Sequence, residues 1–295
     1  MNNRLDPLWK EYQEVPIPEE LDMIVSKAIN RSLKARRYKK VKFKWLAGFA
    51  AAAVIFVLII NASTTVAHAL SSIPVVDRII KVLTLKEYVI NEPNYNANIK
   101  VPSISDLDNK ELEVGLNEKY MKENKALYDK FQVEMNDLKK EGDGHLGLDA
   151  GYEVKTDNDS IFSIERYVVK SAGSSSEEIH FDTIDKKNQI LITLPMLFKD
   201  DQFIQVISDN IKEQMNKQMK DDPNKIYWIP GTKDILPTDE FKSIKKDQSF
   251  YINNEGKLVI VFNKYEVGPG YMGVAKFIIP TDVLSSNLVS HNYIR

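Results

Sequence analysis

The sequence predicts an α+β extracytoplasmic region with antiparallel sheets and packed helices, a single transmembrane helix and a short helical cytoplasmic segment. Sixteen uncharged residues run from Trp45 to Ile60, directly after a basic stretch. Residues 1–44 hold 11 Lys and Arg against 6 Asp and Glu, whereas the other 251 residues hold 29 against 36. Helical and strand patterns then alternate irregularly over roughly 200 residues, which favours an α+β class.

Residues 1–40 hold two short helical patterns on either side of Pro16 and Pro18. The second pattern has one apolar stripe that includes Leu21, Ile24, Val25 and Ile29. Forty residues are too few to bury this stripe in a core of their own. We therefore expect it to bind in a groove of a cytoplasmic partner. The alternative, a helix lying on the membrane surface, fits poorly with the acidic residues of this segment.

Residues 45–66 are predicted to span the membrane. Sixteen helical residues cover roughly 24 Å, and the uncharged residues 61–66 extend this toward the roughly 30 Å of a hydrocarbon core. Eight basic residues and no acidic ones occupy positions 31–44. Because Lys and Arg stay inside, we expect a single-pass protein of the cell membrane, with a cytoplasmic N-terminus and an extracellular C-terminus. The alternative is a buried helix of a soluble domain.

A small-residue motif follows this span. Ala67 and Ala69 are spaced as signal peptidase requires, with the cut before Leu70. The same spacing also arises by chance in alanine-rich sequences, so the pattern alone leaves cleavage open. Residues 67–98 are predicted to hold this site and a juxtamembrane linker, because 91–98 are rich in Asn and contain Pro93.

The outer region is predicted in two parts, 99–187 and 188–295. In the first part we expect a long helix at 109–140. Strands should follow at 152–155, 161–170 and 179–184, with a turn at 171–176. In the second part we expect a strand at 190–194 and a helix at 203–219. A hairpin at 250–262, turning about 253–256, a strand at 274–279 and a short helix at 282–288 should follow.

The composition and motifs do not point to an enzyme. The chain has no cysteine, which excludes disulfides, thiolate metal sites and a lipid-modified cysteine. It has no nucleophile elbow, phosphate loop, HExxH or nucleotide fingerprint. We therefore expect no catalytic residues, cofactor or metal. The basic excess lies beside the apolar run, which favours anionic lipid over nucleic acid as its partner.

The segment 265–273 contains Gly-Pro-Gly-Tyr, which favours a tight turn. Tyr271 at such a tip is a rigid binding anchor if it projects into solvent. The alternative is a structural turn that packs Tyr271 inward.

Several motifs together resemble one family. They are IPEELDMIV (17–25), LSSIPV (70–75), TIDKKN (183–188), VISDNIKEQM (206–215), DPNKIYW (222–228) and PGYMG (269–273). The combination resembles the RsiV family of membrane-bound anti-sigma factors, which act on the extracytoplasmic-function sigma factor SigV, along nearly the whole chain. Residues 231–243 do not match the family pattern.

The resemblance implies a function for each region. Residues 1–40 would hold the sigma factor, and the outer region, chiefly 188–295, would be a receptor for lysozyme. Lysozyme binding would permit signal peptidase to cut between Ala69 and Leu70, and a site-2 protease would then cut within the span. The implied lysozyme contacts are Pro269, Gly270 and Tyr271, with Ser174 and Ser175 as a second contact.

The charge of the outer region agrees with this implication, because an acidic outer region suits a cationic ligand such as lysozyme. A cleavage motif behind a membrane span also agrees with it if the cut is conditional. Two other interpretations remain. One is a membrane-anchored cell-wall enzyme, such as a peptidoglycan deacetylase or hydrolase. The other is a secreted binding protein with a long signal peptide.

Overall fold

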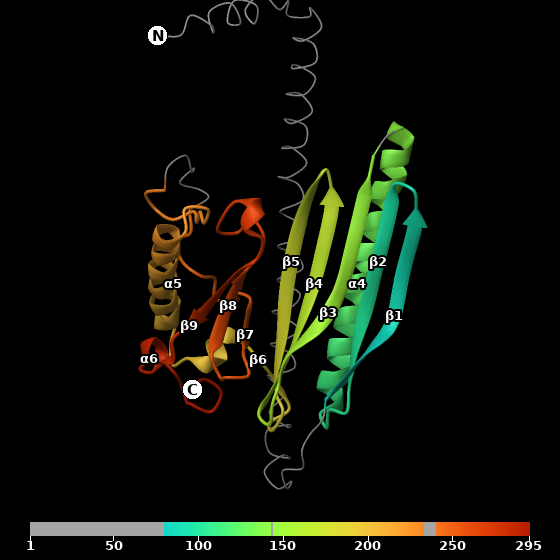
Figure 1. Cartoon of the computed structure of the whole chain (residues 1–295). Coiled ribbons are helices and arrows are strands. Elements are labelled where there is room, and N and C mark those ends of the chain that lie inside the picture. The colour runs from blue at the N-terminus through green and yellow to red at the C-terminus, as the bar shows by residue number, and fades with distance from the viewer. Residues whose placement is uncertain (1–79, 143, 233–239) are drawn as a thin grey trace, which may run out of the picture. The chain divides into compact units, whose positions relative to one another are not determined.

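The protein is described by a computed structural model, in which residues 80–142, 144–232 and 240–295 are placed (Figure 1). The segments predicted at 1–40 and 45–66, and the cleavage motif at 67–70, lie outside these residues. No helix within the described ranges has the length and apolar character needed to cross a membrane.

The first sheet has six strands in the order β1–β2–β3–β4–β5–β6. The strands are β1 (Lys81–Glu92), β2 (Tyr95–Ser105), β3 (Leu146–Asp157), β4 (Ile161–Ala172), β5 (Ser174–Asp185) and β6 (Ile190–Ile192). Neighbours are antiparallel except β2 and β3, which are parallel. The expected antiparallel sheets are therefore confirmed with this one exception. It arises because helix α4 (Lys110–Glu141) carries the chain back along the sheet between β2 and β3.

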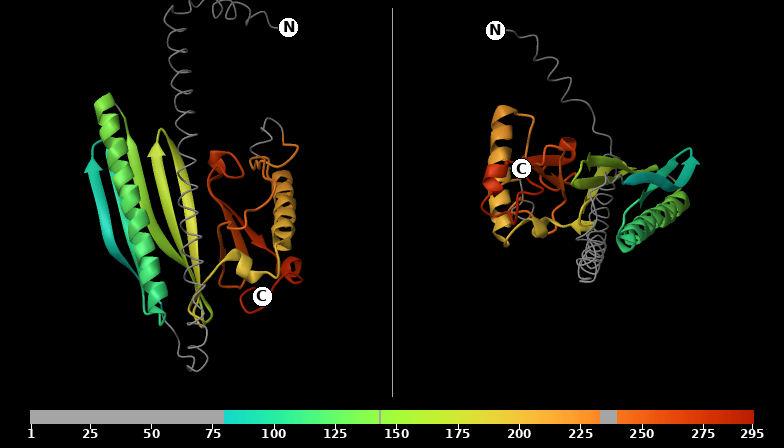
Figure 2. Two further views of the ribbon diagram at one scale, coloured as in Figure 1. Left: turned by 180° about the vertical axis from the view of Figure 1, so that it is seen from behind. Right: turned by 90° about the horizontal axis from the view of Figure 1, so that it is seen from below.

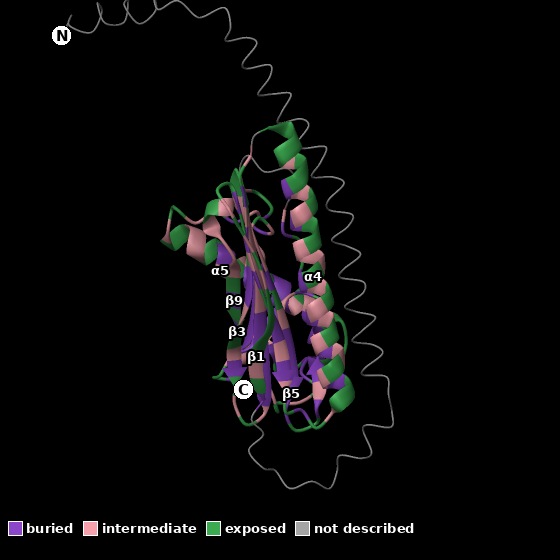
Figure 3. Cartoon of the chain, turned by 90° about the vertical axis from the view of Figure 1, so that its right-hand side faces the viewer, coloured by how far each residue is buried: buried purple, intermediate pink, exposed green. Residues whose placement is uncertain are grey.

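Helix α4 covers one face of this sheet (Figure 2). Its buried side chains recur at helical spacing, among them Leu112, Leu116, Tyr120, Phe131 and Met135. Phe131 and Met135 belong to one core with residues of β2 and β3, namely Ala97, Ile99, Leu146 and Leu148. Much of the outward side of α4 is exposed or intermediate (Figure 3).

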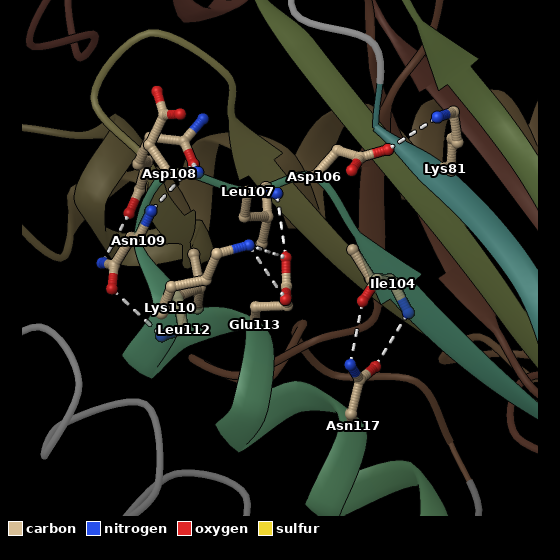
Figure 4. Close-up of polar contacts among 11 residues, drawn as sticks. Lys81, Ile104, Asp106, Leu107, Asp108, Asn109, Lys110, Leu112, Glu113 and Asn117 are labelled. Carbon is tan, nitrogen blue, oxygen red and sulfur yellow. Dashed lines mark hydrogen bonds and ion pairs between the residues drawn. The ribbon is translucent and has the colours of Figure 1, made fainter.

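The N-terminal part of α4 is bonded to the end of β2, and the residue that follows β2 is bonded to the start of β1 (Figure 4). The Asn109 side chain accepts from the Leu112 amide at 3.1 Å and caps the helix. Asn117 donates to the Ile104 carbonyl and accepts from its amide, both at 2.8 Å. Lys81 pairs with Asp106 at 3.1 Å. The end of β2 therefore connects the N-terminal part of α4 to the start of β1.

A charged cluster is buried between α4 and the sheet. Asp182 on β5 binds Lys119 of α4 at 2.8 Å and Arg166 of β4 at 3.1 Å. Arg166 also pairs with Glu123, and its guanidinium lies over the Tyr120 ring at 4.7 Å from the centroid. Burial alone would raise the pKa of the Asp182 carboxyl, but Lys119 and Arg166 outweigh burial and hold that pKa well below its usual range.

The second sheet is antiparallel and has three strands, β7 (Phe250–Ile252), β8 (Leu258–Phe262) and β9 (Ala275–Ile279). The remaining elements here are η1 (Leu194–Leu197), α5 (Gln202–Asp221), η2 (Gly270–Met272) and α6 (Thr281–Leu284). The fully buried face of α5, with Phe203, Ile207, Ile211 and Met215, belongs to a core that includes the side chains of β8 and β9.

Two predicted boundaries are wrong. Residues 81–98 were predicted as part of a linker, but they form most of the β1–β2 hairpin, with Pro93 and Asn94 in its turn. The alternating apolar residues Tyr95, Ala97 and Ile99 were obscured by the asparagines between them. The division between 187 and 188 falls inside the first sheet, because β6 pairs with the end of β5.

Candidate functional site

The Gly-Pro-Gly-Tyr segment forms a single 3-10 turn at the surface. η2 begins after Pro269, and the turn closes through Met272, whose amide donates to the Pro269 carbonyl at 3.0 Å. Gly273 then adopts a φ of 66°, a conformation that favours glycine. The tight turn predicted from the sequence is confirmed.

Tyr271 projects outward from this turn, and its side chain is held in place. The residue is 65% exposed. Its hydroxyl donates to the Asn224 carbonyl at 2.9 Å. The alternative in which Tyr271 packs inward is therefore wrong. A ring that is exposed and fixed at its far end has little conformational entropy to lose on binding, which is the property of a good anchor.

The neighbouring loop at 222–228 packs against the turn and bonds to it. The Trp228 amide donates to the Val267 carbonyl at 2.8 Å. A Cβ atom at Gly268 would lie 2.8 Å from the Ile226 carbonyl oxygen, so only glycine permits this approach. Asp222 accepts from the Asn224 amide at 2.9 Å and shapes the loop that holds the Tyr271 hydroxyl.

Tyr265 is a second exposed aromatic residue here, and sequence reasoning missed it. It is 47% exposed and has a φ of 69°. A Cβ atom at Gly270 would lie 2.3 Å from its ring, so the absence of a side chain at Gly270 lets the two segments pack together. The only signal in the sequence was the tyrosine itself, since the positive φ and the packing on Gly270 arise from the folded loop.

Ser174 and Ser175 lie in a segment that Lys264 connects to that of Tyr265. They follow Gly173, which has a φ of 77° at the tip of the β4–β5 hairpin. The Lys264 ammonium donates to the Ser175 hydroxyl at 2.6 Å and lies 5.3 Å from the centroid of the Tyr265 ring. The two predicted contacts are thus linked by side chains. We call this surface the tyrosine tip, comprising Ser174, Ser175, Lys264, Tyr265, Pro269, Gly270 and Tyr271.

The other predicted site residues lie outside the described part of the chain. They are the cleavage residues Ala67, Ala69 and Leu70 and the apolar stripe Leu21, Ile24, Val25 and Ile29. Within the described ranges, His, Asp and Glu side chains do not gather into a group that could hold a metal ion. The tyrosine tip offers exposed aromatic surface and hydrogen-bonding groups, which suit the binding of another molecule.

The chain is similar to proteins of known name and structure. Residues 196–282 match the model of DUF3298, a protein family of unknown function. The chain is 46% identical to the anti-sigma-V factor RsiV of Bacillus subtilis (strain 168) over 296 residues, with all of both chains covered. The resemblance stated from the sequence is therefore confirmed.

Two solved structures share the fold. A DUF3298-family protein from Bacteroides fragilis aligns with a TM-score of 0.50 and 15% identity, over 72% of this chain and 95% of its own. A DUF3298-family protein from Pseudomonas aeruginosa PAO1 also aligns with a TM-score of 0.50, at 13% identity, over 74% of this chain and 98% of its own. At these identities the likeness concerns the fold alone.

Proposed function

Because this chain belongs to the RsiV family of anti-sigma factors, we propose that it is a single-pass membrane protein that couples an extracellular signal to release of a sigma factor. Residues 1–40 bind an extracytoplasmic-function sigma factor, with Leu21, Ile24, Val25 and Ile29 as the contact stripe. Residues 45–66 cross the cell membrane, with the N-terminus cytoplasmic and residues 70–295 outside. The chain acts by binding, not by catalysis.

The outside signal is lysozyme, and the tyrosine tip is its contact surface. The exposed ring of Tyr271, fixed through its hydroxyl to Asn224, is the observation that carries this proposal. Tyrosine is enriched among the residues that dominate the energy of protein interfaces. The acidic excess of the outer region adds long-range attraction for a cationic protein, which acts mainly on the association rate.

Binding is converted into a cut between Ala69 and Leu70. Ten residues lie between this bond and Ile80, the first described residue, which is buried. Ten extended residues reach at most about 35 Å. Ile80 therefore lies within about 35 Å of the bond, so that a change in the position of the outer region on binding lysozyme can govern access of signal peptidase. A site-2 protease then cuts within the span and frees the sigma factor.

We expect Ala69→Trp to abolish the lysozyme-dependent cut, because signal peptidase accepts only small side chains at this position. The full chain is placed in membranes that contain signal peptidase, with and without lysozyme, and the new N-terminus is sequenced. The wild type should yield Leu70 as the new N-terminus only when lysozyme is present. His68→Trp is the matched control, because the middle position of the motif tolerates large side chains, and it should still be cut.

Two results would contradict this assignment. One is an Ala69→Trp chain that is still cut before Leu70. The other is a wild-type chain that is cut equally with and without lysozyme, which would instead favour a simple signal peptide. Binding of lysozyme to the uncut Ala69→Trp chain, measured by pull-down, separates loss of cleavage from loss of the receptor.

A further inference from the structure

β1 is the outermost strand of the six-stranded sheet (Figures 1 and 2). It pairs with β2 on one side, and within the described ranges no strand pairs with its outer edge. The opposite end of the sheet is covered differently. There β6 pairs with the end of β5, and Ser249 and Asn263 hydrogen-bond to the Ile179 backbone. The edge of β1 thus keeps a row of backbone groups available for pairing.

β1 also carries exposed apolar side chains on the sheet beside this edge. Leu83, Leu85 and Val89 are 66%, 56% and 60% exposed. The register with β2 shifts between Thr84 and Lys86, so β1 is irregular there. From Lys86 to Glu92 the ladder with β2 is uninterrupted. This seven-residue stretch is the part of the edge that is regular enough to accept another strand.

Symmetry and side-chain pairing restrict the registers in which a second copy of the chain could pair with this edge. Two identical antiparallel strands are related by a two-fold axis perpendicular to the sheet, and residues that face each other must point to the same side. One residue must therefore face its own copy. If Lys86 or Glu87 is that residue, like charges meet, which is destabilising. If Tyr88 is the residue that faces its own copy, Glu87 lies opposite Val89 of the second copy, which places a charge beside an apolar side chain.

Pairing about Val89 has none of these conflicts. Lys86 then faces Glu92 of the second copy, which already pairs with Lys139 of its own chain, so that an opposite-charge contact is added twice by symmetry. Tyr88 faces Ile90, an aromatic and β-branched pair, and Glu87 faces Asn91, which can donate to its carboxylate. Val89 faces Val89 on the side of the sheet away from Tyr88. Every position from Lys86 to Glu92 has a compatible partner in this one register.

We propose that two copies of this chain associate through antiparallel pairing of their β1 strands about Val89, which joins the two sheets into one. The proposal does not rest on lysozyme binding. A ladder of seven residues is smaller than the interface of a standard stable complex, so the dimer is weak and forms where the chains are concentrated.

The natural absence of cysteine makes this register directly testable by disulfide formation. Val89→Cys is introduced into the full chain, which is expressed in cells and oxidised mildly in isolated membranes. Its thiol faces its own copy across the two strands, within the range of Cα separations that a disulfide spans. We expect at least about tenfold more disulfide-linked dimer than for Leu83→Cys, a control on the same strand with similar exposure.

A second pair of variants tests the register itself. Glu87→Cys and Asn91→Cys, each alone, should give little dimer, because neither residue faces its own copy. Chains that carry one variant each, with different tags and expressed together, should cross-link to one another. This heterotypic product distinguishes the Val89-centred register from random collision at an exposed edge.

Several outcomes would overturn the proposal. One is equal cross-linking of Val89→Cys and Leu83→Cys. Another is a Val89→Cys thiol that reacts with a maleimide but yields no dimer, since the edge is then free and unpaired. A thiol at this position that resists both reagents shows that something other than a second β1 strand covers the edge, and it overturns the proposal equally.

Discussion

Replacing Tyr271 with alanine should weaken lysozyme binding by about 2 kcal/mol or more, which is roughly a 30-fold loss of affinity or greater. The substitution removes the exposed ring and also the hydroxyl that fixes it to Asn224. Because the ring is already exposed in the free protein, its removal leaves no cavity in the core and should not affect folding. Titration of the full chain with lysozyme by calorimetry measures the effect.

Tyr271→Phe is the matched control for this prediction. It keeps the ring and removes only the hydrogen bond from the hydroxyl to the Asn224 carbonyl. The net contribution of one such bond is about 1 kcal/mol, so we expect a loss of affinity within about tenfold. Unchanged affinity in a folded Tyr271→Ala chain would show that the tyrosine tip is not the lysozyme contact. An equal loss in both variants would show that the hydroxyl contributes the binding energy.

Replacing Asp182 with alanine should destabilise the folded outer region by about 3–5 kcal/mol. Asp182 is 3% exposed and accepts from both Lys119 and Arg166. Its loss leaves the buried cations Lys119 and Arg166 without this carboxylate, while Arg166 keeps its pair with Glu123. Urea unfolding of the full chain in detergent, followed by near-ultraviolet circular dichroism, measures the effect. Asp129→Ala is the control, because Asp129 pairs with Lys125 at the exposed surface of α4, and we expect it to change stability by less than about 0.5 kcal/mol.

The Asp182 cluster also predicts how stability depends on pH. Because the folded-state pKa of Asp182 lies below its value in the unfolded chain, its contribution is fully present above the unfolded pKa of about 3.9 and is lost as the pH falls toward the folded pKa. The free energy of unfolding of the wild type should therefore decrease as the pH is lowered past about 4. The difference between wild type and Asp182→Ala should narrow over the same range, and a constant difference would contradict this assignment.

The elements that the sequence predicted well are those with a strong local period. The long helix expected at 109–140 is α4, and the hairpin expected about 253–256 joins β7 and β8. In both cases the pattern lies within one element or one turn, so neighbouring residues carry all of it. The β1–β2 hairpin was missed because Asn91, Asn96 and Asn98 are typical of loops. Their strand conformation is imposed by the packing of Tyr95, Ala97 and Ile99 beneath α4.

In the candidate site, too, the local features were predicted from the sequence and the contacts between distant residues were not. The motif at 269–273 indicated a turn and its tyrosine, but not the direction of the ring. That direction depends on Asn224, which is 47 residues away in the chain. The meeting of Ser175 with Lys264 spans 89 residues, and Tyr265 was not recognised because its role comes from contact with Gly270 and Lys264.

The sequence by itself determined the family, the order of most helices and strands and the turn that presents Tyr271, and it predicts a membrane orientation. These follow from local composition, local period and motifs. Only the tertiary structure decided that β2 and β3 run parallel, that Asp182 joins two strands to α4, that Tyr271 faces solvent, and that β1 presents an open edge. Each of these depends on which distant segments pack together, and a pattern of neighbouring residues does not contain that information.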